Sequence, residues 1–470
     1  MNRILKIYLP VLALIALAAC KVSKDITHPP APLPATYRNA SNADTAGIAA
    51  IEWKTFFTDV ALLQLLDSAV NNNYDMQLAI KNIEAARLIA RQTKLGYLPE
   101  ANLLAGANIS RPSDNSLNGL SLSQFLGRSY LEDYSAAVAL SWEADIWGKI
   151  KNQQAKALAE FLQTTEARKA IQTNLVADVA KGYYNLLMLD AQLNIANKNL
   201  LLNDSTLRII RLQFDAGQVT ALAVQQATAQ RLVAAQLVPF LQQNITVQEN
   251  AISVLTGVLP GAISRTNSIS NIVLPANLSA GVPALLVSNR PDVKGYELAL
   301  NIANANTGIA KANMYPSLRI TASGGINSFK ASNWFNIPAS LFGAAAGAVT
   351  QPLFQRKALR TQYEVAKIER EKTVIQFRQS VLSAVGEVSD ALVKNEKLRE
   401  QKSIALNRVN TLQQAIANAD LLFRNGMATY LEVITAQANT LQGELELAAL
   451  KKDELNAVVE LYRALGGGWK

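Results

Sequence analysis

One set of motifs occurs twice in this chain, in the same order and about half the chain length apart. The repeated residues are, in pairs, Asp75 and Asp292, Pro99 and Pro316, Phe214 and Phe423, Gly217 and Gly426, and Thr220 and Thr429. The first two pairs are 217 residues apart and the last three are 209 apart, so the second copy is shorter by eight residues. Two similar halves of about 200 residues therefore build the fold.

Composition narrows the fold and function classes further. Half of the 470 residues are hydrophobic but only 6% are aromatic, which is typical of long, closely packed helices. With one His and one Cys, the chain cannot form an internal disulfide, and we expect no Cys/His metal site. The net charge of +9 is spread out, which argues against nucleic-acid binding. Without a nucleophile–base pair or phosphate loop, we expect neither an enzyme nor a cofactor.

The N-terminus predicts export and lipid anchoring. A basic start precedes an apolar run that is too short for a membrane span and ends in a Leu-Ala-Ala-Cys sequence at Cys20, which resembles a bacterial lipobox. We predict a lipoprotein signal peptide over 1–19, acylation of Cys20, and a proline-containing tether over 20–50. Lys21 follows the cysteine, so the Asp signal for retention in the inner membrane is absent. The alternative is an ordinary signal peptide with an incidental cysteine.

Apolar and polar residues alternate in one candidate strand of each half, with β-hairpins expected at about 100–145 and 317–353. The apolar positions are Tyr134, Ala136, Val138, Leu140, Trp142 and Ala144 in one run and Leu318, Ile320, Ala322 and Ile326 in the other. Such alternation matches a membrane β-strand with lipid on one side and water on the other. The alternation equally fits the sheet of a soluble protein that has one solvent-exposed face. We expect the eight-residue difference to lie in the polar loops at the strand tips.

Long helices follow each hairpin. No proline interrupts the chain from Lys149 to about 216 or from Arg356 to about 425, so each run predicts a helix of roughly 100 Å. Apolar residues recur there at alternating steps of three and four, which indicates a coiled-coil seam. The seam positions include Val176, Val179, Tyr183, Leu186, Ala196, Leu207, Ile210 and Phe214 in the first half and Leu431, Ile434, Leu441, Leu455, Val459 and Tyr462 in the last helix.

Glycines mark the ends of these long helices. We expect Gly217 and Gly426 to adopt positive φ where each helix turns back. Thr220 and Thr429 follow three residues later and are expected to cap the return helices. The resulting division is a first repeat over 51–257 with long helices at 149–257, a linker over 258–281, and a second repeat over 282–470 with long helices at 356–465.

Several short motifs together resemble a known family. They are Trp142-Glu143-Ala144-Asp145-Ile146-Trp147-Gly148, Asn289-Arg290-Pro291-Asp292-Val293, Tyr315-Pro316-Ser317-Leu318, Leu255-Thr256-Gly257 and the two Gly-x-x-Thr turns. The motifs occur in this order over about residues 50–465, and together they resemble the outer membrane factor (TolC-like) family. Within that family they are most similar to the lipoprotein branch of efflux-system components (NodT/OprM-like). The resemblance implies a membrane β-barrel plus a long α-helical coiled-coil barrel. These would form in a homotrimer with a 12-strand β-barrel and a 12-helix periplasmic barrel.

Strand closure supports assembly independently of the resemblance. Four strands cannot close a barrel, and an open sheet edge is not tolerated in lipid. Two chains would supply eight strands, which side chains tend to fill. Three chains would supply twelve strands and leave more room for a lumen.

The resemblance also implies a function, as an outer membrane exit duct of a tripartite efflux pump in a Gram-negative bacterium. The duct would be lipid-anchored and would conduct substrates passively from periplasm to exterior. A periplasmic adaptor (membrane fusion) protein and an inner-membrane resistance-nodulation-division transporter would open it. One alternative is a duct for type I protein secretion. Another is a lipid-anchored coiled-coil scaffold without a pore.

Candidate site residues follow from the turns. The resemblance implies that Gly217, Thr220, Gly426 and Thr429 form the periplasmic tip where the adaptor docks. Glu432 stands where TolC-like proteins often carry an acid near the narrowest point, and threefold symmetry would bring three carboxylates together. The alternative is a solvated glutamate on a helix face.

The gate differs from the TolC pattern. Ala223 and Ala428 stand where that pattern has polar or charged lock residues, and Thr435 stands where a second acid ring would lie. The TolC lock is therefore not carried over to this chain. Hydrophobic closure near Leu222 and Leu431 is the alternative.

Overall fold

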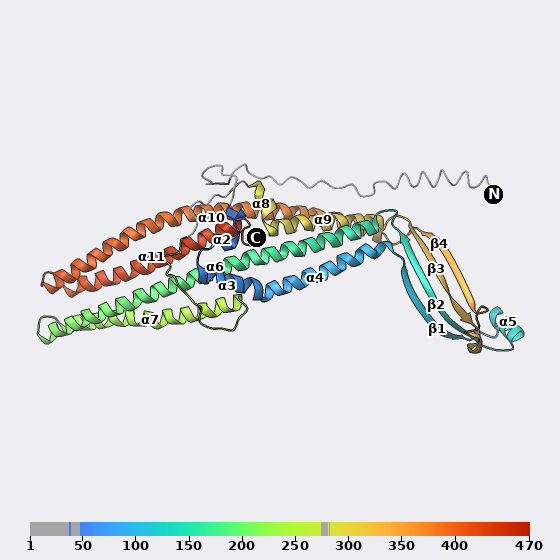
Figure 1. The fold of residues 1–470 in the computed structure, drawn as a ribbon, viewed down its shortest axis with the longest axis horizontal. Coiled ribbons are helices and arrows are strands. Elements are labelled where there is room, and N and C mark those ends of the chain that lie inside the picture. The colour runs from blue at the N-terminus through green and yellow to red at the C-terminus, as the bar shows by residue number, and fades with distance from the viewer. Residues whose placement is uncertain (1–36, 39–47, 274–280, 282) are drawn as a thin grey trace. The chain divides into compact units, whose positions relative to one another are not determined.

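The computed structural model describes residues 37–38, 48–273, 281 and 283–470 (Figure 1). The expected signal peptide, Cys20 and most of the expected tether lie outside the described residues. The chain divides into two compact units. Over the described residues, the first comprises Ala85–Leu162 and Leu298–Ile375. The second comprises the described part of Pro30–Glu84 together with Gln163–Glu297 and Gln376–Lys470.

The first unit contains one antiparallel sheet with the order β1-β2-β3-β4. Its strands are β1 (Glu100–Ser110), β2 (Leu131–Ala144), β3 (Ser317–Ser328) and β4 (Leu341–Thr350). Pairing of β2 with β3 joins the two repeats. Strands β1 and β4 each have only one neighbour in the sheet, so both edges are open within the described chain.

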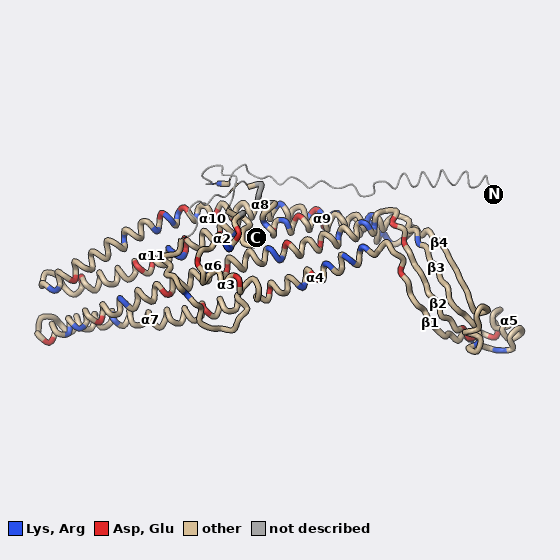
Figure 2. The backbone as a smooth tube through the Cα atoms, in the orientation of Figure 1, with Lys and Arg blue, Asp and Glu red and all other residues tan. Residues whose placement is uncertain are grey.

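The register of β2 and β3 confirms the predicted faces. Apolar residues pair with apolar residues, as Trp142 does with Ile320 and Leu140 with Ala322. Polar residues pair with polar residues in the positions between, and these pairs are Glu143 with Arg319, Ser141 with Thr321 and Ser135 with Asn327. Successive side chains of a strand point to opposite faces, so the sheet has one apolar and one polar face at β2 and β3. Figure 2 shows few charged residues on the strands.

The strand tips hold the length difference between the repeats. The β1–β2 loop covers residues 111–130 and contains α5 (Leu117–Leu126). The β3–β4 loop covers residues 329–340 and contains only the short η3 (Ala331–Asn333). The first loop therefore has 20 residues and the second has 12, and the difference is the predicted eight.

Long helices dominate the rest of the chain. Helices α6 (Lys149–Asp215) and α10 (Ala358–Arg424) have 67 residues each, as the proline-free runs predict. Each returns as a 35-residue helix, α7 (Ala221–Leu255) or α11 (Tyr430–Ala464). The other helices are η1 (Ile48–Ala50), α2 (Trp53–Phe56), α3 (Val60–Asn72), α4 (Tyr74–Lys94), η2 (Leu95–Tyr97), α8 (Ala284–Asn289) and α9 (Pro291–Ala312). Within the described residues, every helix is either too short or too polar to cross a membrane.

The second unit has an apolar core where helices of both repeats meet. Tyr462 of α11 stacks on Phe56 of α2 with ring centroids 4.0 Å apart, and Tyr183 of α6 is fully buried in the same core. The predicted seam is buried through most of its length. Phe214 and Leu431 are exceptions, because they are 43% and 55% exposed in the single chain. Both lie next to the turns of the helical hairpins.

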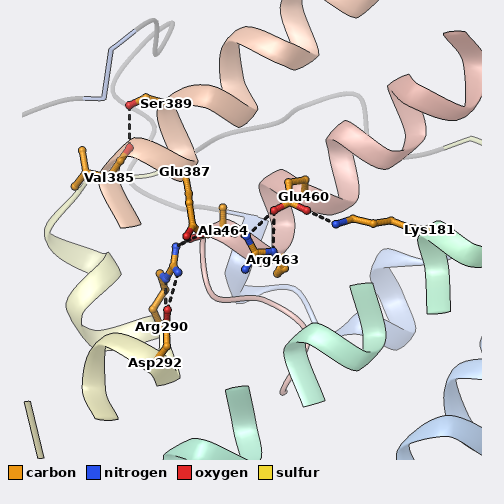
Figure 3. Close-up of polar contacts among 9 residues, drawn as sticks. All are labelled: Lys181, Arg290, Asp292, Val385, Glu387, Ser389, Glu460, Arg463 and Ala464. Atoms are coloured by element: carbon orange, nitrogen blue, oxygen red, sulfur yellow. Dashed lines mark hydrogen bonds and ion pairs between the residues drawn. The ribbon is translucent and has the colours of Figure 1, made fainter. Parts of the chain in front are cut away.

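A chain of ion pairs crosses the second unit and joins four helices (Figure 3). Arg290, whose side chain is 5% exposed, pairs with Asp292 at 2.7 Å and with Glu387 of α10 at 2.9 Å. Arg463 of α11 also contacts Glu387, at 3.0 Å, and continues the chain to Glu460 at 2.5 Å. Glu460 in turn contacts Lys181 of α6. Opposite charges thus alternate from α9 through α10 and α11 to α6.

These ion pairs lower the pKa values of two carboxyl groups, those of Asp292 and Glu460. Burial alone would raise the pKa of the Asp292 carboxyl, but the hydrogen bonds and charge of Arg290 outweigh it and hold this pKa below its usual value. For Glu460, burial likewise raises the pKa, and the hydrogen bonds from Arg463 and Lys181 lower it by more. Both acids are therefore stabilised in the charged form.

Candidate functional site: the helical hairpin tips

The α6–α7 and α10–α11 hairpins turn at glycines with the predicted positive φ, 74° at Gly217 and 72° at Gly426. The Gly217 N–H donates to the Phe214 carbonyl at 2.9 Å, and the next N–H donates to a carbonyl five residues back at 2.8 Å. The same pair of hydrogen bonds recurs around Gly426, at 3.1 and 2.9 Å. Both turns are therefore Schellman motifs, in which glycine avoids the penalty of a β-carbon. Both lie at the same end of the second unit (Figure 1).

The two return helices begin after the predicted threonines, but the side-chain hydrogen bonds at the two helix starts differ. Thr220 and Thr429 are the N-cap residues of α7 and α11, but the Thr220 side chain forms no cap hydrogen bond. The Thr429 N–H and hydroxyl both donate to the Glu432 carboxylate, the hydroxyl at 3.0 Å. A carboxylate at this position satisfies a free N–H and complements the helix dipole. Glu432 therefore stabilises the start of α11.

The two hairpins contact each other through a small apolar cluster, here called the internal seam. Its buried residues are Leu207, Ile210, Ala223 and Ala227 from α6–α7, and Phe423 and Val433 from α10–α11. Ala223 is fully buried, and Ala428 packs against the cluster. Ala223 and Ala428 therefore both lie in apolar packing.

Two hydrogen bonds reinforce the internal seam. The Tyr430 hydroxyl donates to Gln226 Oε1 at 2.8 Å, and Gln437 Nε2 donates to Thr206 Oγ1 at 2.7 Å. Sequence analysis missed all four residues. The partners are more than 200 positions apart, and no local pattern marks either pair.

The three aperture candidates lie on the surface of the single chain. Leu222 and Leu431 are 56% and 55% exposed, and Glu432 is also exposed. Leu222 directly precedes the buried Ala223, so its side chain points away from the internal seam. Exposed leucines at a helix turn are available for contact outside the chain.

Two surface hollows follow the α6–α7 groove. One, of about 470 Å³, lies nearest the turn and is lined mainly by apolar residues, among them Phe214, Val224 and Leu232. The second, of about 430 Å³, is lined in part by three arginines and Asp204. Asp204 pairs with one of these arginines, Arg231, at 2.5 Å. Among the residues that the structure describes, no group of three or more His, Cys, Asp or Glu could hold a metal ion.

The sequence matches the profile of a family described as "Outer membrane efflux protein" over residues 65–258 and 282–467, more than half of the chain. It is 29% identical to the toluene efflux pump outer membrane protein TtgF of Pseudomonas putida, over 98% of this chain and 97% of the relative. It is 28% identical to the cation efflux system protein CusC of Escherichia coli, over 98% of this chain and 99% of the relative. A crystal structure of a membrane protein from Pseudomonas aeruginosa superposes with a TM-score of 0.86 at 26% identity, over 95% of this chain and 100% of that chain.

Proposed function

Because the chain belongs to the outer membrane efflux protein family, we propose that it forms the exit duct of a tripartite efflux pump. The duct conducts substrates passively from the periplasm to the exterior. The observation that carries this proposal is the four-stranded sheet, which has one apolar face and two open edges. An apolar face suits contact with lipid, but unpaired backbone groups at an edge are costly there.

Three copies satisfy the open edges. In a ring, β4 of each copy pairs with β1 of the next, which gives twelve strands around a lumen. The polar face, with Glu143, Ser141 and Arg319, then lines the water-filled interior. The assembly is a homotrimer in outer membrane lipid, in which the helices of the three chains continue the duct into the periplasm.

Aromatic residues near the two ends of β2 support a membrane crossing. At one end, Tyr134 packs against Trp334 with ring centroids 5.9 Å apart. At the other, Trp142 Nε1 donates to the Tyr97 carbonyl at 2.8 Å. Residues 134 and 142 are about 26 Å apart at about 3.3 Å per residue. Barrel strands tilt by about 40°, so this length spans a height of about 20 Å, which covers most of the apolar band of about 25 Å between the aromatic girdles of outer membrane barrels.

The hairpin tips form the periplasmic end of the duct. The turns at Gly217 and Gly426, with Thr220 and Thr429, dock the periplasmic adaptor protein, and a resistance-nodulation-division transporter supplies the substrate. Leu222, Leu431 and Glu432 from three chains surround the aperture. Their exposure in a single chain supports this assignment, because the assembly supplies the missing contacts.

Lipid anchoring at Cys20 completes the proposal. Acyl chains hold the N-terminus to the outer membrane, and more than one chain is needed for a stable anchor. Mass spectrometry of the mature N-terminus should find acyl groups on Cys20 after cleavage behind Ala19. An unmodified thiol, or cleavage elsewhere, would rule out this anchor.

Native mass spectrometry in detergent tests the duct itself. The measured mass should be that of three copies of the chain in one complex. The same preparation should conduct ions in planar bilayers. A monomer in every detergent, without conductance, would refute the duct. A matched preparation unfolded in denaturant and diluted into the same detergent is the control for detergent leakage.

A further inference from the structure

An exposed apolar pair follows directly after β4. Leu353 and Phe354 are 92% and 87% exposed. Val349, near the end of β4, is 71% exposed and pairs with Leu318 on the apolar face of the sheet. The face that the proposed duct turns to lipid therefore continues beyond the strand as the pair Leu353-Phe354. Exposed apolar side chains that are contiguous with such a face mark a contact surface.

Cations follow the apolar pair at once. The ten residues after β4 include Arg356, Lys357 and Arg360 but no Asp or Glu, and all three cations are exposed. Among the residues that the structure describes, none of the three has an acidic partner, and the first ion pair of α10 is that of Lys367 with Glu364. Figure 2 shows Lys and Arg gathered at this end of the sheet, where α6, α9 and α10 meet it.

Local stability does not explain these cations. Arg356 and Lys357 have φ of 48° and 62°, and among the described residues they are the only ones other than glycine with positive φ. A β-carbon makes this conformation costly. Lys357 also directly precedes α10, and a positive charge there opposes the helix dipole. Glycine would suit the backbone better at both positions, so the two side chains point to a contact outside the chain.

An anionic phospholipid matches both parts of the segment. Its acyl chains accept apolar side chains such as Phe354, and its phosphate accepts hydrogen bonds from a guanidinium such as that of Arg356. Residues 354 and 356 are at most about 7 Å apart along the chain. An aromatic ring at the acyl boundary therefore brings the cations to the level of the phosphates, as in other interfacial segments.

We propose that residues 351–360 form a lipid-binding segment, in which the pair Leu353-Phe354 enters the membrane and the three cations bind the phosphates of anionic phospholipids. The inference rests on the proposed duct, because that function places this end of the sheet at the membrane surface next to the periplasm. Bound lipid then fixes how deeply the sheet lies in the membrane. The alternative cover for the apolar pair is a second copy of the chain, which a fluorescence measurement distinguishes.

Lipid binding by charge variants tests the phosphate contacts. The full-length protein in detergent is titrated with phosphatidylglycerol or with phosphatidylcholine of the same acyl chains, and bound lipid is counted by native mass spectrometry. Each basic residue near an anionic lipid contributes about fivefold to the affinity. Arg356→Gln, Lys357→Gln and Arg360→Gln together should therefore weaken phosphatidylglycerol binding by about a hundredfold. Equal binding of the two lipids by the natural protein, or full binding by the triple variant, would overturn the proposal.

The matched control is Lys367→Gln with Lys372→Gln. These lysines are exposed on the same helix but already pair with acids, Glu364 and Glu369. The control should keep the phosphatidylglycerol affinity of the natural protein, and an equal loss would show that net charge alone governs binding. Inorganic phosphate in excess should not displace the lipid, because it has no acyl chains. Displacement by phosphate would identify a site for free anions and overturn the lipid assignment.

A glycine variant separates lipid binding from folding. Arg356→Gly with Lys357→Gly removes two cations and also the cost of a β-carbon at positive φ. The melting temperature in detergent should not fall, whereas the affinity for phosphatidylglycerol should fall by about 25-fold. A lower melting temperature with unchanged lipid affinity would give the two residues a structural role and contradict the proposal.

Phe354→Trp tests the apolar contact. The variant is placed in vesicles of phosphatidylcholine and phosphatidylglycerol with brominated acyl chains, and the natural protein is the reference for its own five tryptophans. Bromine should quench the added tryptophan, because the side chain lies among acyl chains. Absence of quenching would show that a second copy covers this position and would overturn the lipid contact.

The outcomes separate this inference from the proposed function. Trimers that conduct ions but bind both lipids equally would overturn the lipid-binding segment and leave the duct intact. Absence of trimers and of conductance would instead refute the duct, and lipid affinity can be measured on the single chain in either case.

Discussion

The Nη1 atom of Arg290 lies 2.9 Å from Oε2 of Glu387, and this contact links two segments that are 97 positions apart. The same guanidinium is bidentate on Asp292 and donates to the Ala464 carbonyl at 3.0 Å. One side chain thereby fixes the start of α9, the middle of α10 and the end of α11. The long hairpins extend from this point toward the tips.

Removing this guanidinium should destabilise the second unit. Breaking a fully buried ion pair costs about 3–5 kcal/mol, but Asp292 and Glu387 are partly exposed, so we expect Arg290→Ala to lower the free energy of unfolding by about 2 kcal/mol. Arg290→Lys should lose less stability than Arg290→Ala but should not reach the stability of the natural protein. The reason is that lysine lacks the planar guanidinium that binds a carboxylate through two parallel hydrogen bonds. Thermal unfolding in detergent, followed by circular dichroism, measures both.

The matched control for Arg290 is Lys397→Ala. Lys397 contacts Glu396 and Glu400 on the surface of α10, where ion pairs contribute little. Equal losses of melting temperature in Arg290→Ala and Lys397→Ala would contradict a special role for the buried arginine.

Acid should weaken the same region. The pKa values of Asp292 and Glu460 are lower in the folded protein than in the unfolded chain, so the unfolded chain binds more protons as the pH falls. The stabilisation is complete above the pKa of about 4 that these carboxyl groups have in the unfolded chain. It is lost as the pH falls through their lower pKa values in the folded protein. Melting temperatures recorded from neutral to acid pH should decline in that range.

A double variant isolates this pH effect. Asp292→Asn with Glu460→Gln should be less stable than the natural protein at neutral pH but should lose less stability on acidification. Identical slopes for the two proteins would show that other carboxyl groups cause the decline.

Valine in place of either tip glycine should distort its turn. Gly217 and Gly426 have positive φ, where a β-carbon costs about 1–2 kcal/mol, although no neighbouring atom lies near the added carbon. Gly217→Val and Gly426→Val should weaken adaptor binding, measured with purified components, while leaving insertion into the outer membrane unchanged. Gly386→Ala is the control, because Gly386 lies within α10 without positive φ and its added carbon also meets no neighbour. Full adaptor binding by both valine variants would exclude a docking tip at these turns.

Glu432→Gln should change ion selectivity. If three Glu432 carboxylates surround the aperture, neutralising them should reduce cation preference and block by multivalent cations in planar bilayers. Glutamine keeps an oxygen that accepts from the Thr429 N–H, so the start of α11 is retained. Glu371→Gln, an exposed acid of α10 in the other unit, should leave both properties unchanged. Unchanged selectivity and block in Glu432→Gln would leave helix capping as the function of this glutamate.

The sequence by itself determined the features that depend on local spacing. Absence of proline over Lys149–Asp215 was enough for a helix of 67 residues, because each backbone bond in a helix is made within four residues. The alternation around Trp142 was enough to assign the faces of β2, since side chains of a strand alternate strictly. Gly217 and Gly426 marked the turns because only glycine reaches positive φ without penalty.

Only the tertiary structure decided which of two equivalent residues is buried. Phe214 and Phe423 occupy the same place in the repeat, yet one is 43% exposed and the other 5%. Burial depends on what lies opposite, and the facing hairpin is some 200 positions away in the chain. The same holds for Arg290 with Glu387 and for the hydrogen bond between Tyr430 and Gln226, because partners so far apart meet only when the helices pack.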